Sequence, residues 1–264
     1  MPEILEIEMY RRGAKPIIGR RIAEVDAPDA WFLKGADARS MEAALVGARI
    51  ATLDRIGKLL LMVTDAGTVG LRFGMTGRLV IDDEPIIPVL EYSSKRLDVA
   101  WNRFRLVFEG GGDLAINDPR RLGGVELEPD RHRLGSDAWS LTLDELTGLV
   151  GRTTRPLKAL LLDQSRIAGL GNLLADELCW RTGIHPGTPC DELDAERIKT
   201  LAMAIAPMLD ELYERGGSHC GDHVEARNPE APCPRDGGPM AHGAIAGRST
   251  WWCRDHQGAV GAEV

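Results

Sequence analysis

Hydrophobic and polar positions change their spacing about halfway along the chain. Before residue 130, short runs are apolar or alternate apolar with polar residues, and turn signals separate them at 65–67 and 110–112. After one N-terminal helix over 3–18, this half is predicted to form a sandwich of two small sheets. The candidate strands are 21–27, 48–56, 58–64, 68–73, 77–82, 103–109 and 113–118.

Beyond about residue 130, apolar residues recur every three or four positions, which is typical of amphipathic helices. Thr142 and Asp194 are suitable N-caps, and Gly216-Gly217 ends the last helix before a short tail. The whole pattern predicts an α+β protein with domains over 1–130, 131–217 and 218–264. The predicted helices are 141–150, 155–163, 170–180 and 194–214.

Composition narrows the class of protein. The 264 residues are 44% apolar and 27% charged, which excludes collagen, long disorder and a coiled coil. No apolar run approaches the ~20 residues that span a bilayer. The first twelve residues carry three carboxylates where a signal peptide needs basic residues, so we expect a cytoplasmic protein with no membrane partner. Because the net charge is −8, a surface that binds an anion would have to use single, well-placed cations and backbone amides rather than a continuous basic stripe.

The tail carries a spacing that is typical of metal ligands. Cys233 and Asp236 are separated by two residues, as are Cys253 and His256, and sixteen residues lie between the pairs. Two such pairs, brought together by one hairpin, match the geometry of a zinc ribbon. Zinc accepts thiolate, imidazole and carboxylate ligands. We therefore predict one structural zinc ion per chain, bound by these four residues.

Two other interpretations of the tail stay open. The two cysteines are unrelated thiols in a hairpin held by Trp251 and Trp252, or Cys220 and His223 replace one of the ligand pairs. The odd number of cysteines, five, does not suggest a disulfide framework.

A glycine-rich corner precedes the strongest helix of the second half. Gly169 and Gly171 allow a tight turn and close backbone approach, and Asn172 is a candidate cap. Free amides at a helix N-terminus bind phosphate without high net charge. The alternative is an ordinary helix–turn–helix corner with glycine for packing, and spacing alone does not separate the two.

Several motifs occur together and in order along nearly the whole chain. They are Met-Pro-Glu at 1–3, Arg-x-Gly-Lys at 55–58, Gly-Met-Thr-Gly at 74–77, Asn-Asp-Pro-Arg-Arg at 117–121, the segment 164–172 and the tail 247–257. With them the chain resembles the formamidopyrimidine-DNA glycosylase / endonuclease VIII family of base-excision repair enzymes. The resemblance implies a catalytic β-sandwich domain, a helix–two-turns–helix domain and a zinc-ribbon-like hairpin (zinc finger).

The resemblance also implies a bifunctional DNA glycosylase and abasic-site lyase. Such an enzyme removes oxidised or ring-opened bases from duplex DNA, and we expect it to act as a monomer. Once Met1 is removed, Pro2 presents a secondary amine that attacks the deoxyribose C1′ and forms a Schiff base. Glu3 would handle protons at the sugar, and Lys58 would contact phosphate and assist catalysis.

A base must leave the duplex before its glycosidic bond is attacked. In the family, a methionine, an arginine and a phenylalanine fill the resulting hole, and further residues grip the backbone or the bound nucleotide. In this sequence the hole-filling residues would be Met75, Arg120 and Leu122, the last replacing phenylalanine, and the gripping residues Lys158, Asn172 and Arg248.

The sequence departs from the family pattern at a few places. Leu5 replaces a proline, Asp236 and His256 replace two cysteines, and the loop 217–232 is shorter than the family's lesion-capping loop. These changes bear on which lesion is recognised. The alternatives are therefore the same chemistry on oxidised pyrimidines or bulky alkylated purines, and a non-catalytic protein that binds damaged DNA on the same scaffold.

Overall fold

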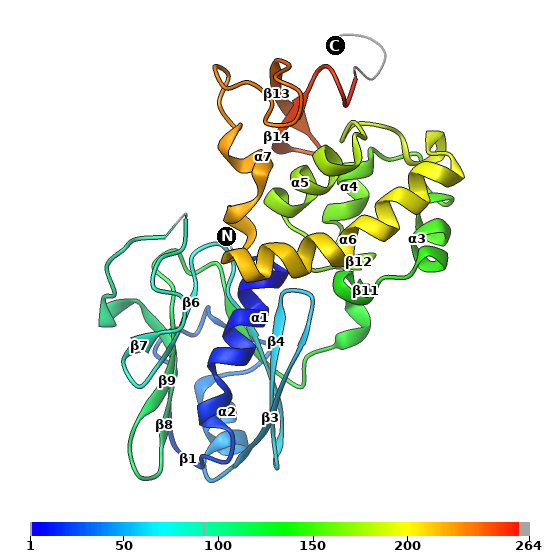
Figure 1. Cartoon of the computed structure of the whole chain (residues 1–264). Helices are drawn as coiled ribbons and strands as arrows, with labels where there is room; N and C mark the ends of the chain where they lie inside the picture. Colours follow the sequence, from blue (N-terminus) through cyan, green and yellow to red (C-terminus); the bar gives the residue numbers. More distant parts are fainter. Residues whose placement is uncertain (1, 92, 259–264) are drawn as a thin grey trace. The chain divides into compact units, whose positions relative to one another are not determined.

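The computed structural model describes residues 2–91 and 93–258, and contacts divide them into two compact units (Figure 1). The first unit takes in residues 6–131 together with Pro2. The second takes in Glu3–Leu5 and the chain from His132 onward. In the described part of the chain, no helix is long and apolar enough to cross a membrane.

The first unit contains two five-stranded sheets, with strand orders β1-β8-β9-β6-β7 and β2-β10-β5-β4-β3. All neighbours are antiparallel except β10 and β2. The bounds are α1 (Ile4–Gly13), β1 (Ile22–Asp26), β2 (Leu33–Lys34), α2 (Ala38–Leu45), β3 (Ile50–Ile56), β4 (Leu59–Thr64), β5 (Gly67–Arg72), β6 (Arg78–Ile81), β7 (Glu84–Pro85), β8 (Asn102–Phe108), β9 (Asp113–Asn117) and β10 (Gly124–Leu127).

One apolar core joins the two sheets to the first helix. Its buried side chains come from both sheets and from α1, including Ile7, Phe104 and Leu71. The alternation of strand β8 explains this arrangement, since every second residue from Phe104 to Phe108 is buried. The predicted two-sheet fold with an N-terminal helix is confirmed.

Local details of the first unit differ from the prediction. Helix α1 ends at Gly13, and a 3₁₀ turn (Lys15–Ile17) follows, because Pro16 has no N–H to continue the helical ladder. Helix α2 was not predicted. Its N-cap, Asp37, accepts a hydrogen bond from the Ser40 amide, and this capping residue was the available signal.

The second unit is mainly helical and ends in a two-stranded hairpin. Thr142 and Glu145 form a capping box at the start of its first helix, and Asp194 caps its longest one, as predicted. The bounds are β11 (Ser136–Asp137), α3 (Leu143–Val150), α4 (Leu157–Leu162), β12 (Ile167–Ala168), α5 (Asn172–Thr182), α6 (Ala195–Arg215), α7 (Asp222–Glu225), β13 (Met240–Ile245) and β14 (Arg248–Cys253).

The hairpin β13–β14 has a two-residue turn. Ile245 pairs with Arg248, and the turn residues Ala246 and Gly247 have φ of 52° and 68°. Two central residues with positive φ fit the twist of antiparallel strands and make a tight hairpin turn. Arg248 therefore lies directly after the tip of the hairpin.

Candidate functional site

The Glu3 side chain lies at the N-terminus of α5, within the second unit. Its carboxylate accepts hydrogen bonds from the amides of Gly171 (2.6 Å), Leu173 (2.9 Å) and Leu174 (3.3 Å). The side chain is fully buried. These amides have no partner inside the helix, and the positive end of the helix dipole favours a carboxylate there.

This contact bears on the two interpretations that the sequence left open for the glycine-rich corner. The amides do bind an anion, but that anion is the chain's own Glu3 rather than a phosphate. Asn172 is the first helical residue and not the cap, because Gly171 occupies the N-cap position. The glycines permit this close approach: a Cβ at Gly171 would lie 2.3 Å from the Glu3 carboxyl carbon.

Pro2 and Lys58 belong to the first unit. Pro2 directly precedes Glu3, and the hydrogen bonds from the α5 amides hold Glu3 in place. Lys58 lies in the two-residue turn between β3 and β4, where Ile56 pairs with Leu59. Lys58 is half-buried there.

A buried carboxylate supports the same hairpin. Glu8 accepts hydrogen bonds from Arg11 (2.8 and 2.7 Å) and Arg12 (2.7 Å), and Arg55 on β3 lies 3.3 Å away. Burial alone would raise the pKa of Glu8, but the hydrogen bonds from the two helix arginines lower it to about 2. Glu8 is therefore charged at neutral pH and ties α1 to β3.

Two turns of the first unit bring together the three predicted hole-filling residues. Met75 lies in the turn between β5 and β6, while Arg120 and Leu122 lie between β9 and β10. The turns are joined by a hydrogen bond of 2.5 Å from the Thr76 hydroxyl to the Asp118 carboxylate. A Cβ at Gly74 would come within 2.5 Å of the Leu122 backbone, so glycine permits this packing.

Asp118 organises the second of these turns. Its buried carboxylate accepts hydrogen bonds from the backbone amides of Arg120 (3.1 Å), Leu122 (2.8 Å) and Gly123 (2.9 Å). Arg120 is exposed, and Leu122 has 48% of its surface in solvent. The turn that Asp118 fixes therefore presents both side chains to solvent.

Arg121 anchors the outside of the turn. It has a positive φ of 56°, and its guanidinium makes a two-pronged ion pair with Asp29, with both contacts at 2.6 Å. The Arg121 hydrogen bonds hold the pKa of Asp29 below its usual range. The turn is therefore fixed both from the core and from the surface.

The residues expected to grip DNA in the second unit converge on strand β14. Asn172 donates from Nδ2 to the Ser249 carbonyl (3.1 Å), and Lys158 donates to the same carbonyl (3.1 Å). Arg248, the preceding residue, is exposed. Lys158 is fully buried, so in this structure it does not offer its ammonium at the surface as the resemblance implies.

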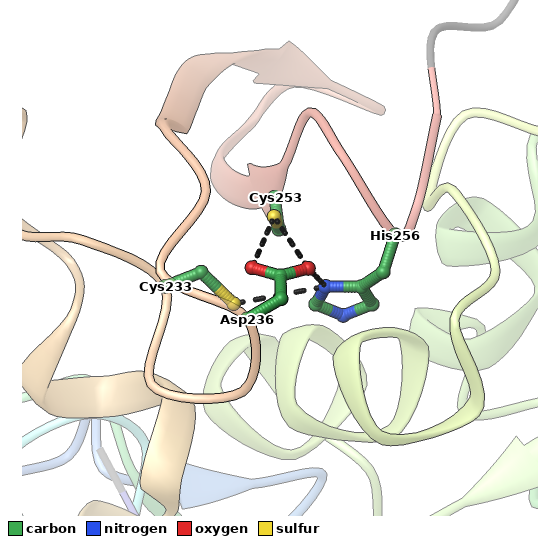
Figure 2. A group of neighbouring side chains, drawn as sticks. All are labelled: Cys233, Asp236, Cys253 and His256. Atoms are coloured by element: carbon green, nitrogen blue, oxygen red, sulfur yellow. Dashed lines mark hydrogen bonds and ion pairs between the residues drawn. The ribbon is translucent and has the colours of Figure 1, made fainter.

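The four predicted metal ligands form one cluster (Figure 2). Their ligand atoms lie within 4.8 Å of one another. Asp236 Oδ2 is 2.7 Å from His256 Nδ1, and the Cys233 and Cys253 sulfurs lie 3.6 Å from Nδ1 and 3.4 Å from Asp236 Oδ1. Ligands around tetrahedral zinc are about 3–4 Å apart. The residues present therefore fit a metal ion.

Surrounding groups orient these ligands. The Trp180 indole N–H donates to Cys233 Sγ (3.3 Å), and the Trp180 carbonyl accepts from His256 Nε2 (3.1 Å), which leaves Nδ1 to face the cluster. Such outer contacts fix the tautomer and support thiolate charge. The Gly238 amide keeps the pKa of Asp236 well below its usual range, and burial raises the pKa of Cys253 to about 11. A bound metal ion would favour the thiolate form of Cys253.

The alternative pair does not join the cluster. Cys220 lies in a 3₁₀ turn after α6, and His223 is buried in α7. Among the residues that the structure describes, the group with metal-ligand geometry contains neither of them. An apolar cluster that includes Trp180, Met240 and Trp251 packs around the two ligand cysteines.

Three supporting residues were not found from the sequence: Asp118, Asp176 and Trp180. Asp118 belongs to the 117–121 motif, and its position before a Pro-Arg-Arg turn was an available signal. Asp176 and Trp180 lie on α5 at spacings that look like ordinary helix. Their partners are far away in the chain, so no local pattern marks them.

The fold and these sites define a two-unit α+β protein of the helix–two-turns–helix class. The family model for the "Formamidopyrimidine-DNA glycosylase N-terminal domain" matches residues 1–125, and that for the "Formamidopyrimidine-DNA glycosylase H2TH domain" matches residues 134–223. The chain also shares its fold with solved Lactococcus lactis Fpg complexes with abasic-site DNA and with FAPY-dG-containing DNA. In both, the TM-score is 0.82 at 22% identity, covering 97% of this chain and 99% of the other.

Curated relatives extend the match over the full length. The formamidopyrimidine-DNA glycosylase of Alkalilimnicola ehrlichii is 31% identical over 96% of this chain and 98% of its own. That of Solibacter usitatus is 33% identical over 86% of this chain and 82% of its own. The chain therefore belongs to the formamidopyrimidine-DNA glycosylase family.

Proposed function

We propose that this protein is a DNA glycosylase of base-excision repair that releases damaged bases from duplex DNA and then cleaves the strand as an abasic-site lyase. Family membership supports the glycosylase activity. The observation that carries the catalytic proposal is the Pro2-Glu3 start, with the Glu3 carboxylate held by three amides of α5.

The chemistry follows from the secondary amine that Pro2 presents once Met1 is removed. An α-amino group titrates near pH ~8, so part of it is neutral and nucleophilic at neutral pH. The Pro2 nitrogen would attack C1′, a C–N bond would form, and the base would leave with the glycosidic electron pair and a proton. The Pro2 nitrogen then loses its proton, the C1′–O4′ bond of the sugar breaks with O4′ taking a proton, and an iminium between Pro2 and C1′ remains. The iminium acidifies the C2′ proton, and loss of that proton breaks the C3′–O bond and releases the 3′-phosphate. Glu3 would manage protons at the sugar, and Lys58 would contact the adjacent phosphate.

The two joined turns of the first unit supply side chains for the space that an extruded base leaves. Unpairing and unstacking a base costs a few kcal/mol, which inserted side chains partly offset. Met75 and Leu122 are apolar, and Arg120 can hydrogen-bond the opposite base. The turn around Asp118 holds Arg120 and Leu122 in place. Arg248 and Asn172 would act on the backbone from the second unit.

The metal of the tail is proposed to be zinc with a structural role. Two thiolates, an imidazole and a carboxylate suit zinc, and the ion would hold the two ends of the hairpin that carries Arg248. Elemental analysis of protein purified without chelator is expected to give one zinc per chain. A small fraction of one zinc, with DNA binding intact, would show that the hairpin needs no metal.

The test of the function is product analysis with a panel of duplexes. One strand would carry a single oxidised purine, ring-opened purine, oxidised pyrimidine, bulky alkylated purine or abasic site. Base release together with strand cleavage supports the proposal, and the preferred duplex identifies the lesion. Tight binding of damaged duplexes without release or cleavage of any of them would favour a non-catalytic damage-binding protein.

A further inference from the structure

A lysine and an aspartate form a completely buried ion pair inside the second unit. Lys158 of α4 and Asp176 of α5 both have no exposed surface, and Nζ lies 2.6 Å from Asp176 Oδ1. The ammonium also donates to the Thr250 hydroxyl (2.7 Å) and to the Ser249 carbonyl (3.1 Å). The three oxygens around the ammonium, two hydrogen-bonded and one ion-paired, all belong to the protein. The Lys158 charge is therefore engaged inside the second unit.

The contacts of Lys158 lead directly to Arg248. The Thr250 hydroxyl accepts from Lys158 and donates to the carbonyl of Arg248 itself (2.9 Å). The Ser249 carbonyl, on the next residue, accepts from both Lys158 and Asn172. The backbone on the C-terminal side of Arg248 is thus held by polar groups from two helices. On its other side lies only the two-residue turn of the hairpin.

Stability alone is a poor reason for this pair. Removing two charges from water costs several kcal/mol per ion, and a well-packed apolar pair is often as stable or more so. Burial raises the pKa of Asp176 to about 6 even though Lys158 lies beside it, which shows how strongly the site disfavours charge. Arg227 is the next cation, with Nη2 3.9 Å from Asp176. Buried ionic groups of this kind are best attested where they fix a geometry.

The geometry points to Lys158 and Asp176 as positioning residues that fix Arg248 through the Thr250 hydroxyl and the Ser249 carbonyl, without touching DNA. This inference rests on the proposed function, because it concerns how the hairpin meets a phosphate. In this inference Lys158 positions the hairpin and does not bind a phosphate directly. It also explains why an exposed arginine on a tight hairpin needs a charged pair in the core behind it.

Thr250→Val is the sharpest variant, because it removes one hydroxyl and keeps the β-branched shape. We expect its affinity for a duplex with an abasic-site analogue to fall about fivefold, as when Arg248 itself is removed, which is within the loss associated with one hydrogen bond. In an Arg248→Ala background the same change should cause no further loss. The matched control is Thr182→Val, whose hydroxyl donates to the Leu178 carbonyl of its own helix (2.8 Å) and which should bind normally.

The ion pair itself is tested by the double variant Lys158→Met with Asp176→Leu, which leaves no unpaired buried charge between these two positions. A thermal melt shows whether the double variant folds. If it does not fold, the Thr250→Val variant alone tests the inference. Added to Arg248→Ala, the double change should leave both the affinity and its salt dependence unchanged. If Lys158 contacted phosphate, the slope of log K against log salt would fall by a further ~0.9. That result would overturn the inference.

Amide hydrogen exchange of the free protein separates this inference from the proposed function. In Thr250→Val, the amides of residues 248–250 should exchange at least about tenfold faster, while those of α6 stay unchanged. If the wild-type protein fails to prefer damaged duplexes, the proposed function is wrong, yet the exchange result still decides whether the pair fixes the hairpin. Unchanged exchange at 248–250 would overturn the positioning role whatever the protein binds.

Discussion

The two units hold their candidate DNA-contacting side chains in different ways. In the first unit, Arg120 and Leu122 lie on one short turn, and a carboxylate two to four residues away, Asp118, binds its amides. In the second unit, Arg248 depends on groups from α4 and α5, more than seventy residues earlier in the chain. The first arrangement is local and the second is assembled only by the tertiary fold. Removing Asp118 should therefore disturb only its own turn. Removing any one group that holds the hairpin should loosen the hairpin as a whole.

Removing the local support should have the largest effect. Asp118→Ala leaves three backbone amides and the Thr76 hydroxyl without their acceptor in a buried place, which we expect to lower the free energy of unfolding of the first unit by about 3 kcal/mol. Urea unfolding measures the change.

Asp98→Ala is the control, since Asp98 caps a short 3₁₀ turn of the same unit through one amide. It should cost about 1 kcal/mol. Equal losses for the two variants would mean that Asp118 does not organise its turn.

Breaking the metal cluster should test the second arrangement. Cys253→Ser replaces one thiolate ligand, so we expect the metal to be lost. Affinity for damaged duplex should fall by about fiftyfold, because the whole hairpin loses its ordered structure and not Arg248 alone. The unfolding of the first unit should stay unchanged. Cys220→Ser lies outside the cluster and should keep both the metal and the affinity. Tight binding by metal-free Cys253→Ser would show that the ion pair alone holds the hairpin.

The prediction from sequence was accurate where the support is local. The caps Thr142 and Asp194 and the paired ligand spacing around Cys233 are all marked by neighbouring residues. Contacts between distant positions left no such mark. The Glu3 carboxylate accepts hydrogen bonds from amides of a helix that begins about 170 residues later. The sequence therefore left open whether the corner at Gly171 is a phosphate site or a packing turn.

The buried carboxylate at Glu8 gives a pH test of a contact that joins a helix to the Lys58 hairpin. Its pKa of about 2 lies below the ordinary value of 4.5, so its stabilisation is fully present above about pH 4.5 and is lost as the pH falls toward 2. Glu8→Gln should lower stability at pH 7 by about 1.5 kcal/mol, after a discount for solvent screening.

The difference between the Glu8→Gln variant and wild type should shrink below pH 4.5. Glu109→Gln is the control, because its pair with Arg21 is loose at 3.8 Å and exposed. It should change stability little at any pH. A pH-independent loss in Glu8→Gln would attribute the effect to packing rather than to charge.

The smallest expected effect concerns Arg248 alone. Arg248→Ala should weaken binding of all duplexes by a similar factor, about fivefold, and reduce the salt slope by ~0.9, as the loss of one phosphate contact does. Fluorescence anisotropy at several salt concentrations gives both values. A loss restricted to one type of lesion would instead assign Arg248 to lesion recognition.

The central claim is that Pro2 is the nucleophile, and borohydride trapping tests it most directly. Protein processed to begin at Pro2 would be mixed with abasic duplex and borohydride, and the crosslinked peptide would be located by mass spectrometry. The account predicts an adduct on the Pro2 nitrogen and its loss when a short N-terminal extension blocks that amine. An extended protein that traps DNA as well as the processed one, or an adduct on Lys58, would contradict it.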